Sequence, residues 1–205
     1  MLIPIQGGFP EPAFEAFFEN YRLHLCECDI DRNIVYFNAE RRDGPIQEAY
    51  RADLRTNKLD KLDESEWGAF PCGLFEDHSK VFIMDGYTLG DRVLYLLENG
   101  RKNLLFGTPL NQRMPGEAVP LNGLGSVAFT PGGTAALLTT SLFDDRYSLG
   151  LIGFTRPGDI QPVRLEDLVH TGMGELKDFS HLKGARYAVH LNIDGASWLY
   201  EGIFN

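Results

Sequence analysis

The sequence predicts an all-β fold built from repeated, antiparallel units of four short strands. Residues 125–165 show the unit most clearly, because four short β-rich segments alternate there with three turns of glycine, proline and polar residues. The same order of strands and turns recurs before and after this segment, although few residues are repeated. Units of about 40 to 50 residues with this pattern are typical of the blades of a β-propeller.

The expected second strands of the units set the period of the repeat. They begin near Val35, Val81, Ala135 and Arg186, so the units follow one another at intervals of 46 to 54 residues. These intervals fit propeller blades with loop insertions. We assign the units to residues 21–63, 69–107, 123–166 and 174–205, and we expect only three strands in the last one.

Two closures of the propeller fit this division. Residues 1–6 could supply the missing fourth strand and close a small ring of four blades. Alternatively, the chain is a fragment of a ring with more blades. We favour the fragment, because four-bladed rings are rare.

An N-terminal extension, residues 1–20, precedes the units and is expected to hold one short helix over residues 9–20. Phe14, Phe17 and Phe18 recur there with the helical spacing i, i+3, i+4. The pattern predicts an amphipathic helix whose aromatic face packs on a larger surface, or, in the alternative interpretation, docks a partner.

The strands are placed by runs of β-rich residues, many with alternating polarity, between turn signals. In the first two units we expect strands at Tyr21–Cys28, Ile34–Glu40, Ala49–Leu54, Lys58–Leu62, Phe70–Phe75, Lys80–Met84, Arg92–Leu97 and Arg101–Phe106. In the last two we expect them at Gly125–Phe129, Ala135–Ser141, Tyr147–Phe154, Ile160–Leu165, Glu175–Phe179, Ala185–Leu191 and Ala196–Phe204. Asn99–Gly100 predicts a tight hairpin, since both residues tolerate positive φ, whereas Asp85–Asp91 and Ser180–Gly184 are expected to be a loop and a turn.

Composition limits the classes of partner. Hydrophobic residues make up 43% of the 205 residues, which is enough for a sizeable core. The net charge of −10 argues against nucleic acid and against an anionic membrane surface. Three cysteines, no long apolar run and no signal-peptide pattern at the N-terminus together predict a cytoplasmic protein without a disulfide framework.

The hairpin Thr130-Pro131-Gly132-Gly133-Thr134, followed by Ala-Ala-Leu-Leu, carries a family resemblance. It resembles the Ser-Pro-Asp-Gly hairpin between the first and second strands of TolB-like propellers and of the N-terminal propellers of the prolyl oligopeptidase family of serine peptidases. The later segment 151–159 resembles the third strand and turn of those blades. The equivalent hairpins at 77–80 and 181–184 lack the Pro-Asp-Gly sequence.

The resemblance implies a propeller that works with a C-terminal α/β-hydrolase domain. No Gly-x-Ser-x-Gly nucleophile motif occurs in these 205 residues, so we expect no catalytic residue and no cofactor in this chain. The first hypothesis is therefore the non-catalytic propeller portion of a prolyl-oligopeptidase-like peptidase, which gates or orients a peptide substrate. The second is a TolB-like scaffold for protein–protein interaction without enzymatic activity. A propeller enzyme with its own site on the loop face is the third.

The candidate binding residues are charged residues in the loops between the second and third strands of the units. In a propeller these loops gather on one face, where ligands are usually bound; the alternative is that they are ordinary solvated turns. The candidates are Arg41, Arg42, Asp43, Asp85, Asp91, Asp144, Asp145 and Arg146.

Two groups of residues have side chains of the types that bind metals or act in catalysis. His24, Cys26 and Cys28 alternate along one strand and should share a face, but neighbours on that face lie roughly 6.5–7 Å apart, too far for ligands of one zinc ion. The histidines at positions 170, 181 and 190 have no serine or cysteine partner at motif spacing. We therefore expect neither a metal site nor a catalytic histidine.

Overall fold

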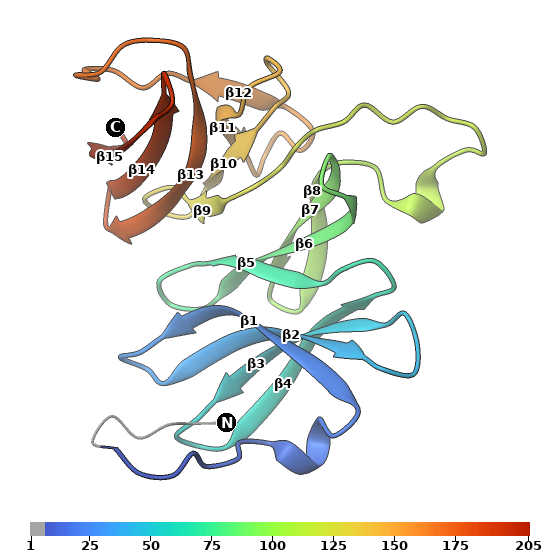
Figure 1. The fold of residues 1–205 in the computed structure, drawn as a ribbon. Coiled ribbons are helices and arrows are strands. Elements are labelled where there is room, and N and C mark those ends of the chain that lie inside the picture. The colour runs from blue at the N-terminus through green and yellow to red at the C-terminus, as the bar shows by residue number, and fades with distance from the viewer. Residues whose placement is uncertain (1–6) are drawn as a thin grey trace. The chain divides into compact units, whose positions relative to one another are not determined.

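The computed structural model describes residues 7–205, and its regular structure is almost entirely β-sheet (Figure 1). Four antiparallel sheets follow one another along the chain, and within each sheet the strands lie side by side in sequence order. The sheets are β1 (Tyr21–Asp29), β2 (Ile34–Arg41), β3 (Gln47–Asp53), β4 (Lys58–Ser65); β5 (Phe70–Leu74), β6 (Lys80–Thr88), β7 (Asp91–Glu98), β8 (Arg101–Phe106); β9 (Val127–Phe129), β10 (Ala135–Thr140), β11 (Ser148–Gly153), β12 (Ile160–Val163); and β13 (Gly174–Lys183), β14 (Arg186–Ile193), β15 (Ala196–Ile203).

These sheets confirm the predicted fold class. Three have four strands and the last has three, as the repeat pattern predicts. The chain divides into two compact units, Met1–Ala69 with the first sheet and Phe70–Asn205 with the other three. The residues proposed to complete the last sheet, 1–6, lie outside the described part of the chain.

The first unit is held together by an aromatic cluster on one face of its sheet. Phe37 and Tyr50, from neighbouring strands, stack with ring centroids 5.5 Å apart. Phe18, which precedes β1, meets both rings edge to face at 5.4 and 5.1 Å. Such edge-to-face contacts add to the burial of apolar area, so the segment before the sheet covers this face.

The predicted helix over residues 9–20 is wrong. Only one turn of 3-10 helix, η1 (Glu15–Phe17), forms there. Phe14 has a φ of 57°, which an α-helix does not allow. Phe18 is buried in the aromatic cluster, whereas Phe17 is largely exposed, so the three phenylalanines do not share one face. A helix this short is marginal by itself in water, and the packing of Phe18 decides the conformation instead.

In the second unit, both faces of the middle sheet are buried. Leu138 on β10 lies in a cluster with residues of β6, β7 and β8, including Phe82. Leu137, its neighbour in the sequence, points to the opposite face and lies in a cluster with residues of β13 and β14. Burial on both faces explains why β10 is an almost continuous apolar run rather than an alternating one.

The glycines of the Thr130–Thr134 hairpin are required by its geometry. Gly132 and Gly133 have φ of 81° and 64°, and the Gly133 N–H donates to the Thr130 carbonyl at 2.9 Å. A Cβ on Gly133 would lie 2.5 Å from the ring of Phe75. The hairpin at Asn99 and Gly100 also has both residues at positive φ, as predicted.

The segment Asp85–Asp91 is mostly strand and not the predicted loop. β6 continues to Thr88 and β7 begins at Asp91, with Asp85 paired to Val93. The turn itself is reduced to Leu89 and Gly90. Polar residues and glycine suggest a loop locally, but the cross-strand partner on β7 extends the ladder.

Candidate functional site

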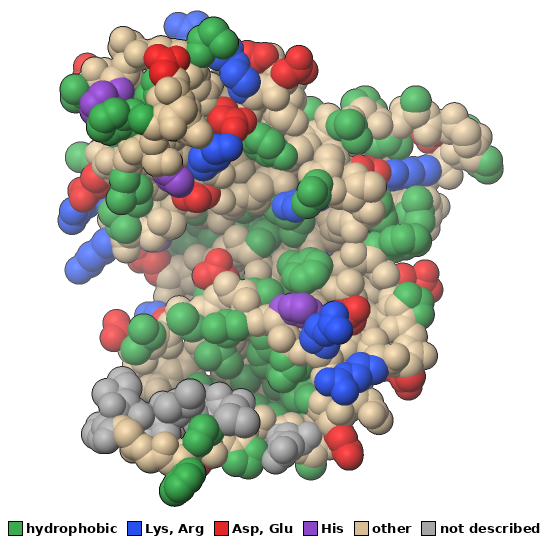
Figure 2. Space-filling model, viewed as in Figure 1, with side chains coloured by type: hydrophobic (Ala, Val, Ile, Leu, Met, Phe, Trp, Pro, Cys, Tyr) green, Lys and Arg blue, Asp and Glu red, His purple; other side chains and the backbone are tan. Residues whose placement is uncertain are grey.

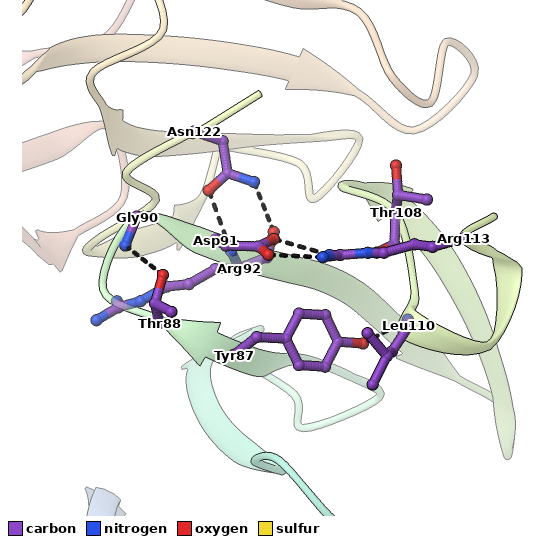
Figure 3. A network of polar contacts seen from close by, with 9 residues as sticks. All are labelled: Tyr87, Thr88, Gly90, Asp91, Arg92, Thr108, Leu110, Arg113 and Asn122. Carbon is purple, nitrogen blue, oxygen red and sulfur yellow. Dashed lines mark hydrogen bonds and ion pairs between the residues drawn. The ribbon is translucent and has the colours of Figure 1, made fainter. Parts of the chain in front are cut away.

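At one end of the second unit, the side chain of Asn122 binds the backbone of Arg92 at the start of β7 (Figure 3). This end, called the loop end below, comprises residues 88–91, 107–124 and 141–147. The Asn122 side chain accepts a hydrogen bond from the Arg92 N–H at 3.2 Å and donates to the Arg92 carbonyl at 2.7 Å. It therefore pairs with the start of β7 as a strand backbone would. Its own carbonyl accepts from the Thr140 hydroxyl at 2.6 Å, at the end of β10.

A second tie fixes the first half of the long connector between β8 and β9. Arg113 forms a bidentate ion pair with Asp91 at 2.7 and 2.8 Å and also donates to the Thr108 carbonyl (Figure 3). Its guanidinium group lies over the ring of Tyr87, 4.5 Å from the centroid. The Tyr87 hydroxyl in turn accepts from the Leu110 N–H at 2.7 Å. Bidentate ion pairs with little exposure are among the stronger polar contacts in proteins. The Arg113–Asp91 pair, called the Arg113 clip below, therefore holds the connector in place.

Breaking this clip should free the connector. We expect Arg113→Ala to accelerate amide hydrogen exchange in residues 108–121 by about 10- to 100-fold, since charged hydrogen bonds with little exposure contribute roughly 1.5–3 kcal/mol. The matched control is Arg146→Ala, which removes an ion pair to Asp144 whose two side chains are about half exposed. Equal exchange rates in the wild type and Arg113→Ala would show that the clip does not hold the loop.

Apolar side chains are exposed around the two polar contacts described above, the Asn122–Arg92 pairing and the Arg113 clip. Leu89, Met114 and Leu121 are 78, 76 and 69% exposed. A Cβ built on Gly90 would lie 3.1 Å from Leu121, which places Leu121 against the β6–β7 turn. In the space-filling view, hydrophobic side chains lie along the projecting connector among acidic and basic ones (Figure 2). The loop end therefore exposes three large apolar side chains close to its polar contacts.

A pocket of about 440 Å³ lies beside the connector. Its lining is mainly apolar, with Asn122 and Thr108 as its polar side chains, and the volume is in the usual range for small ligand sites. Its lining residues are Leu104, Leu105, Phe106, Gly107, Thr108, Val119, Pro120, Asn122, Leu142, Pro157 and Gly158.

The predicted binding residues are divided between the two units. In the first unit, Arg41 ends β2 and donates to the buried carboxylate of Glu48 at 2.9 Å. Arg42 and Asp43 are exposed in the loop that follows. Arg41 is therefore engaged within its own sheet.

In the second unit, three of the predicted loop residues do lie together. Asp144, Asp145 and Arg146 are exposed in the β10–β11 loop, where Arg146 pairs with Asp144 at 2.5 Å. Asp91 belongs to the Arg113 clip at the same end. Asp85 differs, because it is buried on β6.

The sequence did not single out Asn122, Arg113 or Tyr87. Each belongs to a segment interpreted as a connector or loop, and each bonds to a residue some 20 to 30 positions away. The available signal was the length of the connector itself, since loops longer than about 12–15 residues inside compact domains are often functional.

The candidate metal ligands His24, Cys26 and Cys28 do not form a regular row on β1. A β-bulge between Leu25 and Glu27 shifts the pairing of β1 with β2, and this interrupts the alternation assumed for His24, Cys26 and Cys28. Burial raises the pKa of the Cys26 thiol to about 11. In residues 7–205 no three His, Cys, Asp or Glu side chains come together in a way that could hold a metal ion.

The three histidines make separate local contacts. His170 stacks on Trp198 with ring centroids 3.3 Å apart, and its Nδ1 lies 2.6 Å from the Tyr200 hydroxyl. His181 lies within hydrogen-bonding distance of the Gly184 carbonyl, and His190 lies 3.4 Å from Asp178.

Neither 3-10 helix in the described part of the chain has the length or apolar character of a membrane span.

The successive antiparallel sheets define a partial β-propeller, and two solved structures with TM-scores above 0.5 support this class. A prolyl endopeptidase matches with a TM-score of 0.52 and 12% identity over 89% of this chain and 27% of its own. An oligogalacturonate lyase in complex with manganese matches with a TM-score of 0.53 and 12% identity over 82% of this chain and 47% of its own. TolB from Acinetobacter baumannii matches with a TM-score of 0.49 and 11% identity over 83% of this chain and 41% of its own.

These likenesses concern the fold alone. The identities are low, and the chain spans less than half the length of each of the three proteins. Neither a protein-family model nor a curated protein matches the sequence. The propeller fold implied by the Thr130–Thr134 hairpin is confirmed.

Proposed function

We propose that this chain is a non-catalytic propeller scaffold whose loop end binds an extended peptide segment. The observation that carries the proposal is the exposure of three large apolar side chains at the loop end, Leu89, Met114 and Leu121, where Asn122 and Arg113 fix the loops by hydrogen bonds. Loops that hydrogen bonds already hold in place lose less conformational entropy on binding. The adjacent pocket offers space for an apolar side chain of the bound segment.

The more specific form of this proposal concerns a larger protein. The chain would be the propeller portion of a prolyl-oligopeptidase-like serine peptidase and would gate or orient peptides for an α/β-hydrolase domain outside these 205 residues. The fold likeness to a prolyl endopeptidase supports this form. The alternative is a TolB-like scaffold for protein–protein interaction with no enzyme attached. We also propose a cytoplasmic location, which the thiol form of Cys26, Cys28 and Cys72 supports.

Peptide selection tests the binding role. Peptides selected from a random display library against the full chain should bind the wild type with micromolar affinity. Met114→Glu combined with Leu121→Glu should weaken them by at least about tenfold, because each change places a charge where an apolar contact is expected. The matched control is Val169→Glu, at an equally exposed position outside the loop end. Equal loss in both variants, or no selected peptide, contradicts the proposal.

Two further observations test the non-catalytic role and its specific form. The selected peptides should remain intact after incubation with the chain, as judged by mass spectrometry, and cleavage that survives purification would overturn the non-catalytic role. The coding sequence after Asn205 separates the two forms: a Gly-x-Ser-x-Gly motif within a few hundred codons supports the peptidase form, and an immediate stop codon excludes it.

A further inference from the structure

Arg92 on β7 is a half-buried arginine beside the loop end, and its charge has no carboxylate partner in the described part of the chain. Its Nη1 group donates a hydrogen bond to the Leu124 carbonyl at 2.8 Å and lies 3.5 Å from the sulfur atom of Met84. Both contacts are with neutral groups. Charged side chains that are partly withdrawn from water are normally paired, so Arg92 retains the capacity to bind an anion.

The nearest carboxylate along the chain, Asp91, does not balance this charge. Both of its oxygens accept hydrogen bonds from Arg113. Neighbouring residues of a strand point to opposite faces, and Figure 3 shows the Arg92 side chain running away from the Arg113 clip. Arg41, another half-buried arginine, is paired with Glu48 at 2.9 Å. Arg92 thus differs from two arginines that have counter-ions inside the fold.

The free part of the Arg92 guanidinium group is the edge formed by Nε and Nη2. Only Nη1 is engaged by the neighbouring residues. Neither Nε nor Nη2 is among the buried polar atoms that lack a partner in the described part of the chain, so both reach the solvent. This edge presents two parallel N–H donors, which match the two oxygens and the single charge of a carboxylate.

The Arg92 side chain is held in place before any ligand binds. Gly86 lies opposite Arg92 in the β6–β7 ladder, and a Cβ built on Gly86 would lie 3.5 Å from the Arg92 Cγ. The aliphatic part of Arg92 therefore lies where no other side chain competes for space. The hydrogen bond to Leu124 holds the far end. A side chain that is already ordered loses less rotamer entropy when it binds.

The segment 121–124 runs from the exposed apolar side chains of the loop end to Arg92. Leu121 lies against Gly90, whose carbonyl accepts a hydrogen bond from the Asn122 N–H at 2.7 Å. Leu124 provides the carbonyl that Arg92 binds. Three residues of chain span at most about 11 Å. A short peptide segment that contacts Leu121 can therefore also reach Arg92.

We propose that Arg92 binds a carboxylate of the peptide segment at the loop end, either an aspartate or glutamate side chain or the C-terminal carboxylate. The inference rests on the proposed peptide-binding role. Residues 1–6 contain no aspartate or glutamate, so their side chains cannot supply this group. The net charge of −10 repels acidic peptides at long range. The carboxylate should therefore occur at one position of a peptide that is otherwise neutral or basic.

Peptides selected from a random library with free C-termini test this preference. Replacing the conserved acidic side chain by its amide, or the terminal carboxylate by an amide, should weaken binding to the wild type by at least about tenfold. The replacement that has the effect identifies the source of the carboxylate. On Arg92→Gln the acid and amide peptides should differ by less than about threefold. The matched control is Arg101→Gln, which removes the same charge from an exposed position outside the loop end and should keep the full preference.

The comparison tolerates structural effects of the substitution, because both peptides are measured on the same variant. An independent readout is the NMR signal of the Arg92 Nε–H, assigned by its loss in Arg92→Lys. At saturation the acid peptide should shift this signal, and the amide peptide should leave it within the range of the other arginine signals. Selected peptides without a carboxylate preference, or the same preference on the wild type and Arg92→Gln, would overturn the Arg92 site and leave peptide binding standing. Failure to select any peptide would overturn both.

Discussion

Glu48→Gln is expected to lower the free energy of unfolding of the first unit by about 2–3 kcal/mol. The Glu48 carboxylate on β3 is almost fully buried and is bound by Lys61 at 2.7 Å, Arg41 at 2.9 Å and the Tyr50 hydroxyl at 3.0 Å. Removing its charge leaves two cations without their shared anion. Both cations are partly exposed and can turn toward water, so the loss should lie below that of a fully buried pair.

Glu64→Gln is the matched control for this substitution. Glu64 binds the same lysine, Lys61, at 2.6 Å, but its side chain is 60% exposed. Exposed ion pairs contribute at most about 1 kcal/mol. Urea unfolding followed by Trp67 fluorescence in a Trp198→Phe background reports on the first unit, since Trp67 lies within residues 1–69. Equal losses in Glu48→Gln and Glu64→Gln would contradict a special role of the buried carboxylate.

The effect of Glu48 should depend on pH in a defined direction. Burial alone raises the pKa of this carboxyl, but hydrogen bonds from Lys61, Arg41 and Tyr50 outweigh it and bring the pKa from 4.5 to about 2. Because the pKa is lower in the folded state, the ionised group stabilises the fold above pH 4.5. That stability is lost as the pH falls from 4.5 toward 2. The difference between the wild type and Glu48→Gln should therefore shrink over this window.

Local sequence signals predicted the strands well wherever turn chemistry and alternation agree. The hairpin at Asn99 and Gly100 and the hairpin at Gly132 and Gly133 have positive φ values that their residues tolerate without strain. β10 was placed by its apolar run, and burial on both faces is the physical reason for that run. The four second strands begin within one residue of their expected positions.

Predictions failed where distant residues decide the local conformation. Phe18 is drawn into the cluster with Phe37 and Tyr50, so the expected helix does not form. The polar segment 180–184 was expected to be a turn, but β13 runs to Lys183 because that residue pairs with Arg186 on β14. The turn is reduced to Gly184 and Ala185. Polar composition does not identify a turn when the opposite strand is available.

The candidate site was even less accessible from the sequence. The charged loop residues are predicted because propeller loops gather on one face. The structure places Asp144–Arg146 and Asp91 at the loop end, but Arg113, the ion-pair partner of Asp91, is not among the predicted residues. Asn122 acts as a backbone substitute beside Arg92, a contact that depends on the return path of a long connector. No pattern of spacing or composition encodes that path.

Phe82→Ala is expected to lower the free energy of unfolding of the second unit by about 3–5 kcal/mol, the usual cost of removing a buried aromatic ring. Phe82 on β6 is fully buried. Its ring stacks on Phe129 of β9 with centroids 3.9 Å apart and meets Phe154 edge to face at 5.9 Å. The ring thus joins the second and third sheets. Trp198 fluorescence during urea unfolding, in a Trp67→Phe background, reports on this unit. The control is Phe143→Ala, at a partly exposed position, which should change the free energy of unfolding by less than about 1 kcal/mol.

A double-mutant cycle separates the ring contact from the cavity. Phe82→Leu and Phe129→Leu keep the positions apolar but remove the stacked pair, so the double variant should be more stable than the two single losses predict. Stacked pairs contribute about 0.5–1.5 kcal/mol beyond burial, and the coupling should fall in that range. Additive losses in the free energy of unfolding would mean that the contact between the two sheets depends on apolar burial and not on ring stacking. A measured coupling would instead show that the stacked pair itself joins successive blades. Phe75 packs on the same cluster, and the missing side chain of Gly133 leaves room for its ring.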